Sequence, residues 1–122
     1  MSYDASNIFA KILRGEIPCT KVYEDEFALA FKDIHPQAPV HILVIPKGPY
    51  VSHDDFIGSA PDEEIAGFER AVGKTVAAAG VINDGYRLIA NCGVNAHQEV
   101  PHYHIHIVGG ADLGPMLAKP AK

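Results

Sequence analysis

Three histidines stand on alternate positions in the stretch HYHIHIVGG at residues 102–110. Successive side chains of a β-strand point to opposite faces, so His102, His104 and His106 are expected to form one histidine row. The residues between them are expected in the core: Tyr103, Ile105 and Ile107. Imidazole has a pKa of about 6.5, so one ring can be an uncharged nucleophile while its neighbours donate hydrogen bonds or carry a proton. The row therefore indicates phosphoryl or nucleotidyl transfer, with His104 facing phosphorus.

A metal ion is the main competing interpretation of the histidine row. Two histidines at this spacing chelate well, and His41 is a further candidate ligand. With a rise of about 3.3 Å per residue, the backbones of His102 and His106 lie roughly 13 Å apart. One ion with bonds near 2.0 Å does not easily take all three rings. We therefore expect no metal and no other cofactor, and keep a metal-binding protein that uses His102, His104 and His41 as an alternative.

Other polar residues supply what such a site lacks. Asp33 follows an expected strand and precedes a turn, where its carboxylate either accepts hydrogen bonds from a ribose diol or caps the turn. His41 lies within an apolar strand, as a satisfied core residue or as a member of a histidine group. The loop before the row adds polar side chains expected near the phosphate: Asn91, Gln98 and Glu99.

The composition limits the class of protein. With 122 residues, of which 48% are hydrophobic and 20% charged, the chain is expected to form a single domain over residues 1–122. The net charge of -5 and the lack of a Lys/Arg stripe argue against a nucleic-acid partner. No apolar run is long enough to span a membrane, and the first residues do not resemble a signal peptide, so we expect a cytoplasmic protein. Cys19 and Cys92 are expected to be free thiols.

Periodicity predicts the elements that position these side chains. Residues 8–13 have helical spacing, with Ser6 as the expected cap and Gly15 at the end. Residues 20–33 alternate as a hairpin, and 39–47 form an interior strand. Residues 59–80 contain one long helix. Residues 85–93 and 102–110 supply two more strands. These elements predict an α+β fold in which an antiparallel sheet of about five strands packs with one long and one short helix.

The motif resembles the histidine triad (HIT) superfamily, whose signature is His-x-His-x-His followed by two apolar residues, here HYHIHIV. The resemblance covers nearly the whole chain. Residues 8–48, IFAKILRGEIPCTKVYEDEFALAFKDIHPQAPVHILVIPKG, and residues 113–118, LGPMLA, resemble the histidine triad nucleotide-binding (Hint) branch. The double glycine at 109–110 favours that branch over the dinucleoside-polyphosphate hydrolases.

This resemblance implies a purine nucleoside phosphoramidase, which cleaves the P–N bond of compounds such as adenosine 5'-phosphoramidate. The products are a mononucleotide such as AMP and an amine, formed through a covalent nucleotidyl-histidine. His104 is then the nucleophile, and His102 and His106 flank the phosphate. His106 protonates the leaving amine, and His41 completes a histidine hydrogen-bond network.

The same resemblance implies the nucleotide-binding residues and the assembly. Asp33 and Ile34 would hold the ribose and base, and Asn91, Gln98 and Glu99 would lie near the phosphate and ribose. The family implies a HIT-like fold whose sheet extends across a homodimer, a purine mononucleotide as the small-molecule partner, and no metal.

Two positions depart from the family pattern on the leaving-group side. His97 stands where a small residue, often glycine, is expected, and Ala111 stands where an arginine commonly follows the double glycine. Two further functions stay open beside the metal-binding alternative. They are a dinucleoside polyphosphate hydrolase of the same superfamily and a non-catalytic nucleotide-binding regulatory protein.

Overall fold

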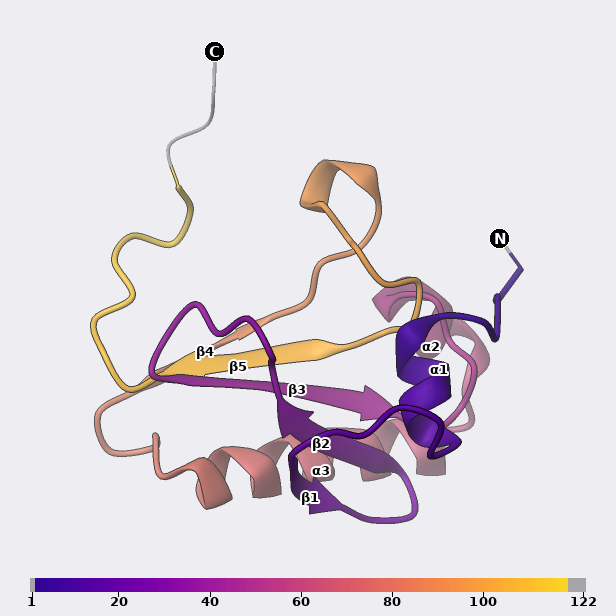
Figure 1. Ribbon diagram of the computed structural model, residues 1–122, viewed down its shortest axis with the longest axis horizontal. Coiled ribbons are helices and arrows are strands. Elements are labelled where there is room, and N and C mark those ends of the chain that lie inside the picture. The colour runs from indigo at the N-terminus through magenta and orange to yellow at the C-terminus, as the bar shows by residue number, and fades with distance from the viewer. Residues whose placement is uncertain (1, 119–122) are drawn as a thin grey trace.

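A five-stranded antiparallel sheet forms the centre of the computed structural model, which describes residues 2–118 (Figure 1). The strands are β1 (Lys21–Glu24), β2 (Ala28–Lys32), β3 (Val40–Pro46), β4 (Tyr86–Ile89) and β5 (Ile105–Gly109). Their order across the sheet is β1-β2-β3-β5-β4, and every neighbouring pair is antiparallel. The predicted α+β class, hairpin and interior strand are thereby confirmed.

Three α-helices accompany the sheet: α1 (Ile8–Leu13), α2 (His53–Ser59) and α3 (Asp62–Ala79). The predicted long helix is confirmed as α3, which begins after Pro61 with three acidic residues in its first turn and ends at Gly80, whose φ is 72°. The predicted short helix is α1, but Asn7 caps it in place of Ser6, because the Asn7 side chain accepts from the Ala10 amide. Helix α2 is an addition to the predicted elements.

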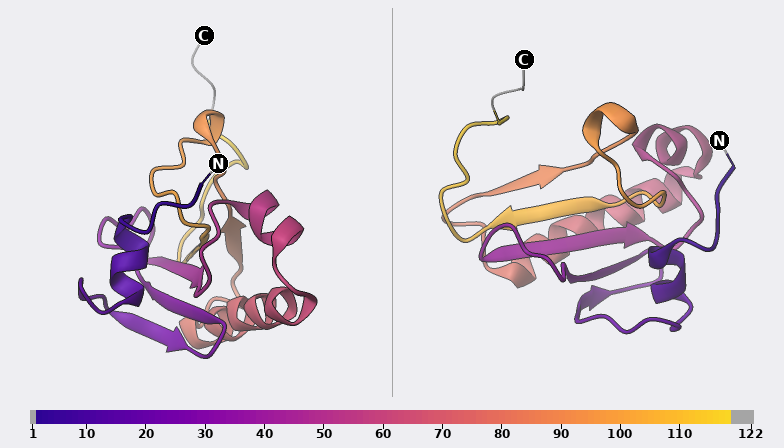
Figure 2. Two further views of the ribbon diagram at one scale, coloured as in Figure 1. Left: turned by 90° about the vertical axis from the view of Figure 1, so that its right-hand side faces the viewer. Right: turned by 45° about the horizontal axis from the view of Figure 1, so that its top comes forward.

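The two faces of the sheet carry different apolar clusters. Helix α3 runs along one face, as Figures 1 and 2 show, and packs on a cluster that includes Ala28, Ala30 and Ile107. The opposite face carries Leu29 and Phe31 beneath Phe9 of α1. Period-two alternation predicts this division for residues 28–31, because alternate side chains of a strand face opposite ways. Phe27, which the same alternation places with Leu29 and Phe31, precedes β2 and instead lies against Gly67 of α3.

The register of β3 and β5 sets the positions of the histidines. Leu43 pairs with His106, and His41 pairs with Val108, so His41 and His106 are diagonal neighbours on the face opposite α3. Strand β5 begins at Ile105, later than the predicted start at residue 102. His102 and His104 therefore belong to the segment that leads into the strand, where the Tyr103 amide bonds to the Tyr50 carbonyl outside the sheet.

No helix in the described part of the chain has the length and apolar character needed to cross a membrane. Cys19 and Cys92 are both free, as expected.

Candidate active site

A cleft of about 430 Å³ opens on the sheet face opposite α3. Six of the predicted site residues line it: Asp33, Asn91, Gln98, Glu99, His104 and His106. They come from the turn after β2, the loop that follows β4, the segment that leads into β5 and β5 itself. The fold thus brings together side chains that lie up to 73 positions apart in the printed numbering, from 33 to 106.

His104 presents one free ring nitrogen to the cleft. Its Nδ1 lies 2.7 Å from the backbone carbonyl of His102, so Nδ1 donates and Nε2 keeps its lone pair. Phe9 and His106 each meet the ring edge to face, with ring centroids 5.0 Å away. Burial lowers the pKa of His104, which keeps the ring neutral at neutral pH. His104 therefore has the charge state and the tautomer of a nucleophile.

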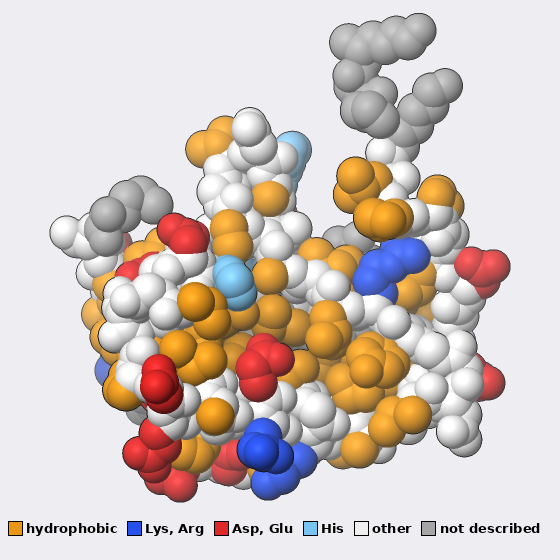
Figure 3. All heavy atoms as spheres, turned by 180° about the vertical axis from the view of Figure 1, so that it is seen from behind, with side chains coloured by type: hydrophobic (Ala, Val, Ile, Leu, Met, Phe, Trp, Pro, Cys, Tyr) orange, Lys and Arg blue, Asp and Glu red, His pale blue; other side chains and the backbone are white. Residues whose placement is uncertain are grey.

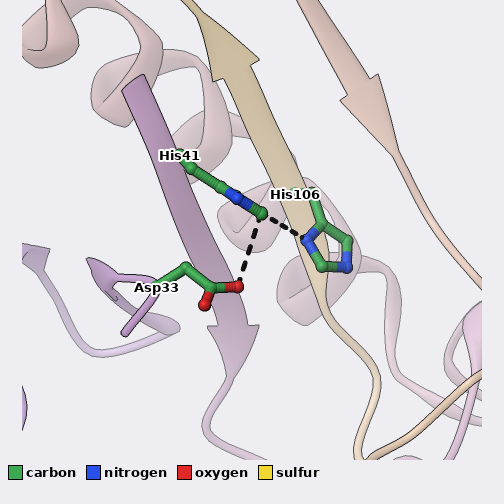
Figure 4. Close-up of side chains that lie close together, drawn as sticks. All are labelled: Asp33, His41 and His106. Carbon is green, nitrogen blue, oxygen red and sulfur yellow. Dashed lines mark hydrogen bonds and ion pairs between the residues drawn. The ribbon is translucent and has the colours of Figure 1, made fainter. Parts of the chain in front are cut away.

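His106, His41 and Asp33 form a connected group (Figure 4), and the His106 ring adjoins that of His104. Nε2 of His41 lies 2.9 Å from Nδ1 of His106 and 3.4 Å from a carboxylate oxygen of Asp33. His41 is only 6% exposed, and its Nδ1 accepts a hydrogen bond of 3.0 Å from the backbone amide of Gln37. His41 thus acts behind His106 and outside the cleft lining.

The Gln37 amide fixes the protons of both rings. An amide can only donate, so Nδ1 of His41 is the acceptor and its proton sits on Nε2. That proton is donated to Nδ1 of His106, which leaves the His106 proton on Nε2. Burial, followed by repulsion from His104 and His41, lowers the pKa of His106 to about 4. His106 is therefore a neutral ring that can donate from Nε2.

His102 does not reach the cleft, contrary to the expectation that it flanks the phosphate. Its side chain is 0% exposed and both of its ring nitrogens are occupied. Nε2 donates to the carbonyl of Pro46 at 2.9 Å, and Nδ1 accepts from the Tyr3 hydroxyl at 2.6 Å. Burial lowers the pKa of His102 to about 4. Its structural contribution to the site is the backbone carbonyl that orients His104.

The loop before the histidine row is held by the side chain of Gln98. Its carboxamide oxygen accepts from the Gly93 amide, and its nitrogen donates to the carbonyls of Val51 and Val100. These bonds shape the wall of the cleft. Asn91 and Glu99 line the same cleft, and the charge of Glu99 acts to raise the pKa of His104 against the larger effect of burial.

Asp33 caps a turn, which is one of the two roles that the sequence left open for it, and it also lines the cleft. One carboxylate oxygen accepts from the His35 amide at 2.7 Å and so caps the turn after β2. The other faces His41, and the residue lines the cleft. Its neighbour Ile34 lies outside the cleft lining and is 80% exposed.

Sequence reasoning missed several residues that line the cleft, among them Phe9, His35 and Gln37, whereas it singled out His97 as a departure from the family pattern. His97 has a positive φ of 57° and follows the short 3-10 helix η1 (Val94–Ala96). Glycine adopts this conformation without steric cost, whereas another residue costs about 1 kcal/mol or more. The family preference for a small residue at this position was the available signal.

Among the described residues, no lysine or arginine lines the cleft. Its formal charges are the carboxylates of Asp33 and Glu99. The donors that the cleft offers to an anion are histidine protons and backbone amides, which are stronger donors to an anion than to a neutral acceptor.

Asp33, His41 and His106 also form a candidate metal cluster, with one ligand atom from each within 4.8 Å of the others. The hydrogen bonds do not suit this reading. The Gln37 amide occupies the lone pair on Nδ1 of His41, so Nε2 carries the proton and has no lone pair for a cation. His102 has no free nitrogen either. A metal would require these bonds to break.

Known proteins resemble this chain over most of its length. Residues 14–113 match the model of the HIT domain family. An uncharacterised 13.2 kDa HIT-like protein of Azospirillum brasilense is 61% identical over 118 residues, which are 97% of this chain and 97% of that protein. The purine nucleoside phosphoramidase of Escherichia coli is 47% identical over 112 residues, 91% of this chain and 92% of that protein. A 14 kDa zinc-binding protein of Zea mays is 46% identical over 114 residues, 90% and 86% of the two chains.

A solved structure shares the fold as well as the sequence. The HIT family hydrolase from Legionella pneumophila superposes with a TM-score of 0.80 at 41% identity, covering 88% of this chain and 95% of that one. The family match, the sequence identity to these relatives and the common fold together show that the chain belongs to the HIT domain family.

Proposed function

We propose that the protein is a cytoplasmic hydrolase of the HIT superfamily that cleaves the P–N bond of purine nucleoside phosphoramidates, as a member of the Hint branch. One observation carries the proposal. The hydrogen bonds leave a lone pair on Nε2 of His104 and a proton on Nε2 of the adjacent His106. A nucleophile and a proton donor therefore stand side by side in one cleft.

The reaction has two displacements at phosphorus. In the first, Nε2 of His104 attacks, the P–N bond breaks, and the amine nitrogen keeps the bonding electrons and takes the Nε2 proton of His106, while His106 takes up a proton from solvent and so stays a neutral ring. In the second, water attacks, the bond from phosphorus to Nε2 breaks, and its electrons return to His104. The first step consumes one proton from solvent and the second releases one. His106 is placed to pass both.

The remaining predicted residues keep their proposed roles, with two adjustments. Asp33 holds the ribose with Ile34 near the base, and Asn91 and Glu99 lie at the ribose and phosphate. Gln98 acts mainly by holding the loop whose amides face the phosphate. His102 acts as a positioning residue through its carbonyl, and His41 as a positioning residue through His106.

The name of the Escherichia coli relative supports this substrate class, since that protein is a purine nucleoside phosphoramidase at 47% identity. The hydrolase name of the Legionella pneumophila structure supports the broader reaction type. Among residues 2–118 the cleft lining has no lysine or arginine, which is easier to reconcile with one phosphate than with the several charges of a dinucleoside polyphosphate.

A trapping experiment tests the proposal. The protein is mixed with adenosine 5'-phosphoramidate labelled at phosphorus and quenched in denaturant, and acid-labile label is expected on His104. The His104→Ala variant should carry none, whereas His53→Ala, an exposed histidine on α2, should label like the wild type. Turnover without any covalent label would refute the nucleotidyl-histidine.

A kinetic panel separates the alternatives. Phosphoramidates should be cleaved faster than dinucleoside polyphosphates, and exhaustive chelation should leave the rate unchanged. Loss of activity on chelation would support the metal alternative, and binding of AMP without turnover of either substrate class would support a regulatory protein.

We also propose that two copies associate through the β4 edge so that their sheets join. Strand β4 is an outer strand, and its Tyr86 and Leu88 are 44% and 45% exposed. Figure 3 shows hydrophobic side chains gathered on the back of the molecule, the side toward which β4 lies. Light scattering should give a dimer mass for the wild type and a monomer mass for Leu88→Lys, with Ile57→Lys on α2 as the matched control. A monomeric wild type would overturn this assembly.

A further inference from the structure

A second hollow of about 230 Å³ lies on the other side of His106 from the end of the cleft where His104 sits. Gln37, Asn91 and His106 line both spaces, so the two are adjacent. The second hollow differs from the cleft in its other walls. Ile89, Val108 and Leu113 make its apolar side, and Arg87 contributes a positive charge.

Arg87 lies on β4, directly opposite Val108 of β5 and therefore on the same sheet face as the histidines. Its guanidinium donates to the carbonyls of Gly114 at 3.0 Å and Pro115 at 3.2 Å. Within residues 2–118, no carboxylate lies within ion-pair distance of it, although four ion pairs form elsewhere in this span. Neutral carbonyls hold the group in place, and its charge has no counterion among the described residues.

An arginine held in this way is suited to a carboxylate. The guanidinium has five N–H donors in a planar fork, and two donated bonds leave donors for a ligand. A carboxylate matches that fork with two parallel hydrogen bonds. The hollow is also smaller than the roughly 300–1,000 Å³ typical of drug-sized ligand pockets, so it suits a small substituent better than a second nucleoside.

We infer that the second hollow binds the leaving amine of the substrate, and that Arg87 selects amines that carry a carboxylate. This inference rests on the proposed phosphoramidase function and names its substrate class as adenylylated amino acids and related amino carboxylates. The nitrogen sits beside Nε2 of His106, the apolar wall contacts the carbon chain, and Arg87 binds the carboxylate at the far end.

The test compares matched substrates. Adenosine 5'-phosphoramidates of glycine, β-alanine and γ-aminobutyrate are each assayed beside the corresponding neutral amide, with the unsubstituted phosphoramidate as reference. For at least one chain length, the wild type should prefer the acid over its amide by roughly tenfold or more in kcat/KM, as expected for a charge-assisted hydrogen bond. The chain length with the largest ratio reports the reach from His106 to Arg87.

Variants assign the preference to one residue. Arg87→Gln should reduce the acid-to-amide ratio to about one, and Arg87→Lys, which keeps the charge but loses the fork, should give an intermediate ratio. Arg70→Gln on the exposed side of α3 is the control and should keep the wild-type ratio. Because each ratio is taken within one variant, a general loss of activity does not alter it, and Arg87→Lys decides the matter where Arg87→Gln does not fold.

Three results would overturn the inference: a wild-type ratio near one at every chain length, an unchanged ratio in Arg87→Gln, or an Arg87→Lys ratio equal to that of the wild type. Failure of the proposed function looks different. In that case the unsubstituted phosphoramidate itself is not cleaved, whatever the leaving group carries.

Discussion

The two ends of the histidine row share a residue type and a low pKa, yet they differ in what they can do. Burial lowers the pKa of both His102 and His106 to about 4. His102 has a protein partner on each ring nitrogen, whereas His106 has a partner only on Nδ1 within the described residues. The number of ring nitrogens that already have a protein partner, more than burial, therefore distinguishes a structural histidine from one that can take part in a reaction.

The largest effect is expected from replacing His104, the central residue of the histidine row. His104→Ala should reduce turnover of a nucleoside phosphoramidate by more than about 10⁴-fold, because it removes the nucleophile of the proposed mechanism. The affinity for AMP, measured by calorimetry, should stay close to the wild-type value. Substantial P–N hydrolysis in the folded variant would contradict the assignment.

Replacement of His106, the end of the row with an unpartnered Nε2 among the described residues, should lower the rate by an amount that depends on the leaving amine. His106→Ala is expected to lower kcat by about 10²- to 10⁴-fold for a basic alkylamine, which cannot depart without a proton. The loss should be much smaller for a weakly basic aniline. A series of amines with graded basicity measures the trend, and a uniform loss across it would remove His106 as the proton donor.

His102 should contribute to the loss of stability at acidic pH, in the same direction as His106, whose pKa is also about 4. His102 has a folded pKa of about 4 and an ordinary value of 6.5, so the unfolded chain binds the extra proton first. The free energy of unfolding should therefore fall as pH drops from 6.5 toward 4, by up to about 3 kcal/mol from this residue. Urea unfolding at several pH values measures it. His102→Gln should start less stable and lose less on acidification, whereas a slope equal to that of the wild type would contradict the prediction.

The smallest effect is expected from removing the Tyr3 hydroxyl that bonds to His102. Tyr3→Phe removes the donor to Nδ1 of the fully buried His102, so it should cost about 1–2 kcal/mol of stability while kcat changes only a few-fold. Tyr23→Phe is the control, because Tyr23 donates to the accessible carboxylate of Asp25, which water can satisfy instead. Equal losses in both variants would show that Tyr3 has no special role at His102.

The fold was predictable from the sequence where local pattern decides the outcome. Alternation assigned Ala28 and Ala30 to one face and Leu29 and Phe31 to the other, and helical spacing with a terminal Gly80 located α3. The pattern was less decisive for short helices. Helix α2 buries only Phe56, so it has almost no periodic signal.

Prediction of the site was limited by partners that are distant in sequence. Spacing and composition identified most of the polar residues that line the cleft. The same spacing grouped His102 with them, because a strand pattern does not show what covers each side chain. The two groups that seal His102 belong to Tyr3 and Pro46, which lie 99 and 56 residues away. The Gln37 amide is a backbone group and has no signal in residue types.

The proton positions in the histidine row depend largely on main-chain atoms. The Gln37 amide sets His41 and, through it, His106, and the carbonyls of His102 and Pro46 set His104 and His102. Side-chain substitutions at those donor and acceptor positions leave the peptide groups in place. The proton positions should therefore survive most point mutations at these residues. At position 37, proline is the one residue type that would remove the hydrogen bond to His41, because proline has no backbone N–H.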